Sequence, residues 1–334
     1  MIEVPGAPRI DGLAFRRFAG DKDYSVMASV GSRSFEADKV DYFETAEDLA
    51  NDYENSPDRD PHSEIIVAEV RGEPIAYGRI STDPETEGRQ VYWHIAQVVP
   101  EWRNTDLRLA MLRFNENQII SMAKSKGASG SISCKVWVLD EPNDWRVMVI
   151  AEGYRPVMHF FEMVRPNLEN IPEVAFPNGL EIRPTRPEDY PKIWNASKEA
   201  FRGKPWFVEA LYDEKYYESW RGSPAFQPDL WRVAWDGDEV AGMARNEIPY
   251  DQNQVYGRSR GHTQHLSVSP RWRRRGLGKA LLAESLRMMR DRGLKEASLD
   301  VETQSTTGEL HLYESMGYEI HRRYAHYAKS LDLV

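Results

Sequence analysis

The feature that most constrains the fold of this chain is a segment that occurs twice. From residue 266 to 282 an apolar run leads through a basic turn into a helix start, reading LSVSPRWRRRGLGKALL. A related segment, VVPEWRNTDLRLAML, lies 170 residues earlier, at 98–112. Three further pairs of similar segments lie 164 to 167 residues apart. Solenoid repeats are roughly 20 to 50 residues long, so this spacing predicts two copies of one domain.

The 334 residues are enough for two domains of ordinary size, each with its own core. We predict one domain over 1–168, a linker over 169–179 and a second domain over 180–334, because 166–179 is rich in Pro and Gly and has little periodicity. In each copy, predicted helices alternate with mostly antiparallel strands. The expected fold class is α/β, with a mixed central sheet flanked by helices in each domain.

Composition narrows the functional classes. The net charge of -10 argues against nucleic-acid binding, and no apolar run approaches the roughly 20 residues of a membrane span. No targeting segment is recognisable, so we expect a cytoplasmic protein, monomeric or homodimeric, with no nucleic-acid or membrane partner. The single cysteine, Cys134, lies in a predicted strand and is interpreted as a packed thiol rather than a nucleophile.

The basic turn predicts a pyrophosphate cradle. Backbone N–H groups at a helix N-terminus attract anions, and Gly276 and Gly278 would let a phosphate approach the main chain without meeting a Cβ atom. In the first copy Asp106 and Arg108 replace these glycines. The second copy is therefore the one expected to bind a phosphate.

The motif Arg273-x-x-Gly276-x-Gly278, with a strand before it and Leu-Tyr-x-x-x-Gly-Tyr at 312–318 after it, resembles the GCN5-related N-acetyltransferase (GNAT) superfamily. The resemblance covers the second copy well and the first as a degenerate copy, so the chain resembles a tandem GNAT protein. It implies acetyl-CoA as co-substrate, a small-molecule amine as acceptor, no metal, and direct transfer in a ternary complex.

The resemblance also implies which residues bind the cofactor. The strand residues would pair with the pantetheine amides as an added strand does, and the turn would wrap the pyrophosphate. The implied set is Leu266, Ser267, Val268, Arg273, Arg274, Arg275, Gly276, Leu277, Gly278 and Lys279. Thr306 stands where many family members carry Asn, and its hydroxyl can replace only one amide hydrogen bond.

Three residues are candidates for proton transfer. Tyr313 occupies the family position that protonates the departing thiolate; the alternative is a core tyrosine. His262 stands at the strand position of the base that deprotonates the amine, and Glu302 is the second candidate base unless it is a solvated strand end. Strand alternation predicts His262 and Gln264 on one face of the sheet, and Thr263 and His265 on the other.

Several features leave alternatives open. The first copy has Val149 in the place of Tyr313 and is predicted to be non-catalytic. Its acidic run at 36–64 is either a solvated helix face or the edge of a path for a cationic acceptor. Aromatic residues of 202–226 either line an acceptor pocket or close the interface between the copies; they are Trp206, Phe207, Tyr212, Tyr216, Tyr217 and Trp220.

Two other functions fit the same resemblance. Mycothiol synthases are also tandem GNAT proteins with an active second half, so a similar acyltransferase is one alternative. The degenerate first copy makes a non-catalytic acyl-CoA sensor or partner-binding module the other.

Overall fold

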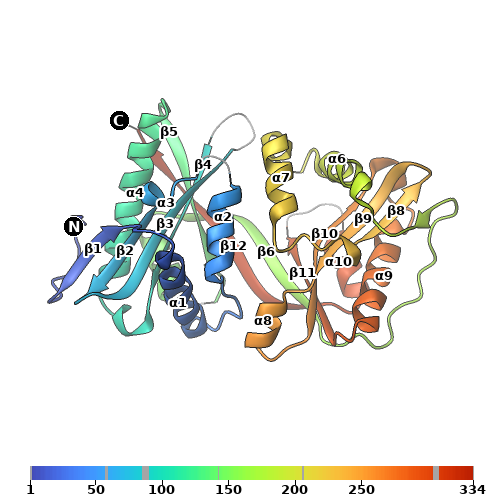
Figure 1. Cartoon of the computed structure of the whole chain (residues 1–334), viewed down its shortest axis with the longest axis horizontal. Coiled ribbons are helices and arrows are strands. Elements are labelled where there is room, and N and C mark those ends of the chain that lie inside the picture. Colours follow the sequence, from blue (N-terminus) through green and yellow to red (C-terminus); the bar gives the residue numbers. More distant parts are fainter. Residues whose placement is uncertain are drawn as a thin grey trace. The chain divides into compact units, whose positions relative to one another are not determined.

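The computed structural model of the chain describes residues 2–56, 59–84, 90–141, 143–204, 207–303 and 308–333, which form two compact units (Figure 1). Unit 1 comprises Met1–Val157 with Ala325–Val334, and unit 2 comprises Met158–Tyr324. These bounds differ from the predicted domain ranges at both ends of the second copy. The difference arises because residues 158–165 pair with a strand of unit 2, whereas the C-terminal ten residues belong to unit 1.

Unit 1 contains five strands of its own and receives the end of β12 next to β5. The strands, in their order across the sheet, are β1 (Leu13–Arg17), β2 (Ile65–Val70), β3 (Glu73–Pro84), β4 (Gln90–Val98) and β5 (Ser131–Leu139). Its helices are α1 (Lys22–Ala37), α2 (Ala46–Asn55), α3 (Pro61–Glu64), α4 (Leu107–Ser125) and α5 (Asp144–Ala151). Neighbouring strands from β1 to β4 are antiparallel, whereas β4 and β5 are parallel. This gives the predicted mixed sheet.

Unit 2 repeats this plan. Across its sheet the order is β12 (Glu319–Asp332), β6 (Arg155–Arg165), β11 (Glu296–Glu302), β10 (Arg260–Val268), β9 (Glu239–Glu247), β8 (Arg232–Asp236) and β7 (Glu181–Ile182). Its helices are α6 (Tyr190–Phe201), α7 (Glu214–Gly222), α8 (Tyr250–Val255), α9 (Leu277–Asp291) and α10 (Glu309–Ser315). The stretch at 166–180 contains no helix or strand, but it lies inside unit 2, so the predicted linker over 169–179 does not separate the two units.

Helices cover both faces of each sheet. In unit 2, Met243 of β9 packs in one cluster with Ile193 of α6. Its neighbour Gly242 points to the opposite face, where an added Cβ would lie 3.1 Å from Leu277 and 3.2 Å from Leu281 of α9. The sheet is thus sandwiched between α6 and α9. Within the described part of the chain, the structure has no helix of sufficient length and apolarity to traverse a lipid bilayer.

The tight approach of α9 to the sheet at Gly242 is testable. We expect Gly242→Ala to lower the free energy of unfolding by about 1–3 kcal/mol, because the methyl group would also lie 3.0 Å from the Ser267 carbonyl oxygen. Gly31→Ala in α1 is the control: there the nearest atom is 3.4 Å away, and helix propensity favours Ala. Denaturant unfolding measures both. Equal stability of the two variants would contradict this packing.

Candidate active site

The two parallel strands at the centre of unit 2 diverge. β10 pairs with β11 only from Arg260 to Thr263, opposite Glu296 to Leu299. From His265 to Val268 it pairs with β9 alone, and within the described residues no strand pairs with its other edge. This leaves the β11-facing edge of Leu266–Val268 without a strand partner. Unpaired main-chain groups of this kind can bind an extended amide-containing ligand as an added strand.

The turn that follows β10 adopts a backbone conformation open to an anion. Arg274 has φ +61°, and Gly276, the N-cap of α9, has φ +82°. A non-glycine residue in the left-handed region costs on the order of 1 kcal/mol, and such strain concentrates at functional sites. No side chain in the described part of the chain caps α9, and the first N–H groups of a helix have no partner within the helix itself.

The protein's own packing does not require the two glycines of this turn to be glycine. A Cβ at Gly276 would meet no atom within 4 Å, and one at Gly278 would meet only Leu312 and Val268, both at 3.6 Å. Among the described residues, no atom therefore crowds these two Cβ positions. This geometry fits the pyrophosphate of a coenzyme A thioester at the helix N-terminus.

The arginines of the turn divide into two groups. The Arg273 guanidinium donates to the carbonyl oxygens of Val268 (3.2 Å) and Ala200 (2.8 Å), so it joins the end of β10 to α6. Arg271 pairs with Asp236 at 2.7 Å, and Arg275 lies over the Trp272 ring. Among the described residues, Arg273, Arg274, Arg275 and Lys279 have no ion-pair partner, and Arg274 and Lys279 also make no side-chain hydrogen bond or ring contact. Of the predicted cofactor-binding set, Arg274 and Lys279 are thus the side chains available to neutralise a phosphate.

A β-bulge corrects the predicted facing of the histidines. His262 lies opposite Glu247 and His265 lies opposite Arg245, with a register shift between Thr263 and His265. Because Glu247 and Arg245 are two residues apart on β9, they share a face, and so do the histidines opposite them. The prediction that His262 and His265 point to opposite faces was wrong. Simple alternation fails where an extra residue enters one strand.

His262 has a hydroxyl and a carboxylate as neighbours on this face. Its Nδ1 lies 3.0 Å from Ser298 Oγ, and its Nε2 lies 3.8 Å from Asp300 Oδ2. Desolvation raises the pKa of the Asp300 carboxyl, which is still partly exposed, and burial raises the pKa of Glu247. Negative charge on either carboxylate would stabilise a protonated imidazole. Ser298, Asp300 and Glu247 were not predicted from the sequence, because only strand register brings them to His262.

The other two predicted catalytic residues are buried. Glu302 lies two residues beyond Asp300, on the same face of β11; it is 8 % exposed, so it is not a solvated strand end. Tyr313 is 7 % exposed, and burial raises its pKa, so the phenol keeps its proton. It is the residue after Leu312, whose Cδ1 lies 3.6 Å from the Cβ position of Gly278, so α10 runs beside the turn. Thr306 lies outside the described residues.

Unit 1 has the same strand divergence. β4 pairs with β5 only from Val91 to Trp93, opposite Ser133 to Lys135. The turn differs, because Asp106 has φ -75° and Thr105 Oγ1 accepts the N–H of Leu107. The left-handed conformation that Arg274 and Gly276 adopt in unit 2 is not repeated at the corresponding described residues, 104 and 106.

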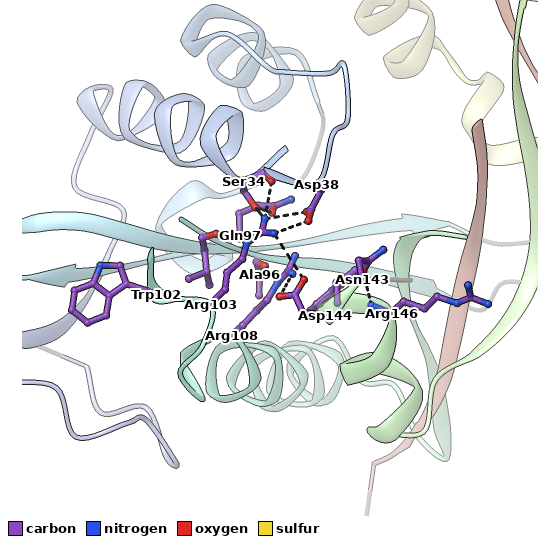
Figure 2. Close-up of polar contacts among 12 residues, drawn as sticks. Ser34, Asp38, Ala96, Gln97, Trp102, Arg103, Arg108, Asn143, Asp144 and Arg146 are labelled. Carbon is purple, nitrogen blue, oxygen red and sulfur yellow. Dashed lines mark hydrogen bonds and ion pairs between the residues drawn. The ribbon is translucent and has the colours of Figure 1, made fainter. Parts of the chain in front are cut away.

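In unit 1 a side chain bonds to the strand edge at the point of divergence (Figure 2). Arg108, which stands in the place of Gly278, donates from Nε to the carbonyl oxygen of Ala96 at 2.9 Å. Its guanidinium also bonds Asp144 at 3.1 Å and lies over the Trp145 ring at 4.5 Å. Arg108 is 3 % exposed. It therefore occupies one main-chain acceptor of this strand edge, the carbonyl oxygen of Ala96.

Three further predictions concern Cys134, the acidic run at 36–64 and the aromatic residues of 202–226. Cys134 is fully buried and its thiol pKa is raised to about 12 by burial, as expected for a packed thiol. Carboxylates of the acidic run pair within unit 1: Glu64 with Arg59, and Asp52 with Arg59 and Arg79. Of the 202–226 aromatics, Trp206 is outside the described residues. Those that pack around Trp194 inside unit 2 are Tyr212, Tyr217 and Trp220, with Phe207 against Tyr212.

Comparison with known proteins points to one family. Residues 190–318 match the model of the Acetyltransferase (GNAT) family. A mycothiol acetyltransferase of Salinispora arenicola is 26 % identical over 281 residues, covering 81 % of this chain and 84 % of that protein. Another, of Catenulispora acidiphila, is 25 % identical over 205 residues, 60 % of this chain; the match spans 63 % of that relative's length.

Solved structures share the fold across nearly the whole chain. A GCN5-related N-acetyltransferase from Sphaerobacter thermophilus has a TM-score of 0.72 and 22 % identity, with 98 % of each chain covered. A tandem GNAT protein from the clavulanic acid biosynthesis pathway has a TM-score of 0.67 and 14 % identity, with 95 % of this chain and 98 % of that chain covered. The predicted arrangement of two GNAT-like folds in one chain is confirmed.

The open turn leads to a prediction about cofactor binding. We expect Gly276→Asp, which copies Asp106 of unit 1, to weaken acetyl-CoA binding at least tenfold. The carboxylate would repel the pyrophosphate, and the side chain would strain the left-handed backbone. Isothermal calorimetry of the full chain measures the dissociation constant.

Gly179→Asp is the matched control for that variant. Gly179 has φ +88° and no atom within 4 Å of its Cβ position, so it carries the same backbone strain away from the turn. Affinity equal to wild type in Gly276→Asp would remove the turn from the binding site.

Proposed function

Because residues 190–318 form a GNAT acetyltransferase domain, we propose that the chain is an acetyl-CoA-dependent N-acetyltransferase that acetylates a small-molecule primary amine. The observation that carries the proposal is the grouping, in unit 2, of an open glycine turn, an unpaired strand edge and a polar face around His262. We expect it to act in the cytoplasm, where acetyl-CoA is available.

The residues of unit 2 suggest a direct transfer. The amine nitrogen attacks the thioester carbonyl carbon, an N–C bond forms and the C–S bond breaks. His262 Nε2 takes the proton that the amine loses, directly or through a water, while Asp300 and Glu247 stabilise the imidazolium. Tyr313 donates its phenolic proton to the thiolate sulfur, giving the N-acetylated product and free coenzyme A.

A ternary complex is favoured over an acyl-enzyme intermediate. The chain has one cysteine, Cys134, and its thiol is buried with a pKa of about 12. Thiolate is the nucleophilic form, and it is scarce at neutral pH for such a group. Positioning the two substrates together then supplies much of the rate acceleration.

We further propose that unit 1 does not catalyse transfer. Arg108 occupies the strand edge where an extended cofactor would bind, and Asp106 brings a carboxylate to the turn. Val149 is fully buried in the place of Tyr313, so unit 1 also lacks the proposed acid. The residues at 106, 108 and 149 would each have to be changed to restore the site.

A second candidate acceptor comes from the relatives. Several curated relatives are mycothiol acetyltransferases, which favours acylation of a cysteinyl-glucosaminyl-inositol acceptor as the alternative. An amine panel that includes this acceptor, assayed with acetyl-CoA by detection of the free thiol of coenzyme A, decides between them. Binding of acetyl-CoA without turnover on any amine would instead favour a non-catalytic sensor.

The role of Tyr313 is tested with the best amine from that panel. We expect Tyr313→Phe to lower kcat at least tenfold with the KM for acetyl-CoA unchanged, because the phenyl ring keeps the packing but has no proton to donate. In the wild type, the raised pKa of Tyr313 keeps the acid protonated, so loss of this proton should cause no fall in kcat up to pH 10.

Tyr318→Phe is the control, because Tyr318 is an equally buried tyrosine of the same cluster, 6.2 Å away between ring centroids. Its kcat should stay close to that of the wild type. Normal turnover by Tyr313→Phe would reduce Tyr313 to a packing residue.

A further inference from the structure

The polar face that carries His262 also contains a buried arginine without a counter-ion. Arg245 of β9 is 5 % exposed and lies opposite His265. Among the described residues, no carboxylate lies within ion-pair distance of its guanidinium. Glu247, two residues along β9, instead accepts a hydrogen bond from Gln264 Nε2 at 2.9 Å. The guanidinium faces the ring of Trp220 at 5.3 Å.

Three polar groups of this face lack partners. Arg245 Nε, His265 Nδ1 and Ser267 Oγ are all buried and make no hydrogen bond to the described residues. Ser267 lies two residues beyond His265 on β10, after the bulge, so the three side chains belong to one face. Native proteins rarely leave such groups unsatisfied, and a group of three calls for a missing partner.

The electrostatics at this position favour an anion. Burial lowers the pKa of Arg245 to about 10, yet the group stays charged at neutral pH. Burial and the neighbouring Arg245 hold the pKa of His265 well below its usual value, so that imidazole is neutral. The net charge of the trio is therefore positive. A buried cation that has no protein partner is costly to keep unless a ligand completes the pair.

We propose that Arg245 binds the carboxylate of the acetyl acceptor, so that the substrates are small amino carboxylates. This inference rests on the proposed function and adds the acceptor's chemical class to it. His262 lies opposite Glu247 in the strand register, and Glu247 is two residues from Arg245 along β9. The end of the site at His262 and the end at Arg245 therefore lie roughly 7 Å apart along the strands. That span suits a compact molecule with an amine at one end and a carboxylate at the other.

A carboxylate fits this site better than a phosphate. The planar guanidinium matches a carboxylate in a two-bond arrangement. A phosphate monoester carries more charge at neutral pH, and the aromatic surroundings, with Trp220 over the guanidinium, would make its desolvation more costly. The acidic groups near His262, Asp300 and Glu247, are suited to the ammonium end of the same molecule.

The first measurement compares matched ligands by calorimetry on the full chain saturated with coenzyme A. The probes are glycine, β-alanine and 4-aminobutyrate, each against its carboxamide, with 2-aminoethyl phosphate as the phosphate probe. We expect at least one amino acid to bind the wild type at least tenfold more tightly than its amide. In Arg245→Met this preference should vanish, whereas Arg290→Met, at an exposed arginine of α9 beside Asp291, should keep it.

The second measurement separates a binding role from a structural one. Met keeps an unbranched chain against Trp220 and removes the unpaired charge, so the melting temperature of Arg245→Met should stay equal or rise. A lower melting temperature together with wild-type ligand preference would make Arg245 a structural residue. Tighter binding of the phosphate probe than of every carboxylate would overturn the carboxylate assignment.

The two proposals fail in different ways. Acetyl transfer to amines with no preference for acids over amides would overturn this inference and leave the proposed function intact. Arg245-dependent carboxylate binding without turnover on any amine would overturn the proposed function and leave the carboxylate site at Arg245 intact.

Discussion

The site in unit 2 depends on the point at which β10 leaves β11. The parallel pair ends at Thr263, and beyond it β10 pairs with β9 alone, after a bulge between Thr263 and His265. Two features of β10 therefore act together. The divergence leaves the strand edge at Leu266–Val268 without a strand partner, and the bulge brings His262 and His265 to the same face. A regular strand would separate the histidines, but the divergence does not need the bulge, since β4 leaves β5 in unit 1 with a regular register to β3.

The two units share a framework and differ in what occupies it. Arg103 and Arg273 make equivalent bonds: each Nε donates to the last residue of the preceding strand, Val98 or Val268. Each NH2 donates to a carbonyl oxygen of a helix, that of Ser34 or Ala200. These matching contacts fix the turn in both copies. The difference lies a few residues further on, where the Arg108 side chain bonds to the strand edge and Gly278 has no side chain to do so.

Local sequence signals predicted much of unit 2. The helix that the sequence predicts after the basic turn is α9, which begins at Leu277 with Gly276 as its N-cap at φ +82°. Capping and propensity act over a few residues, so they can be recognised without knowing the fold. The glycine turn and its degenerate copy were recognisable for the same reason.

Long-range pairing was not predictable in this way. The bulge, and with it the neighbours of His262, depends on the register between strands that are distant in sequence. The assignment of 158–165 to unit 2 and of the C-terminal residues to unit 1 depends on which strand each meets. Arg245 was missed because an arginine inside an apolar strand, VAGMARNE, gives no local sign that its charge lacks a partner.

Hydrogen–deuterium exchange of the full chain with and without acetyl-CoA tests the central claim most directly. If unit 2 alone has an open site, saturating acetyl-CoA slows exchange at 266–268 and 276–279 and leaves the matching amides of unit 1, at 96–98 and 106–109, unchanged. Protection of the unit 1 segments, or of neither set, would contradict the account.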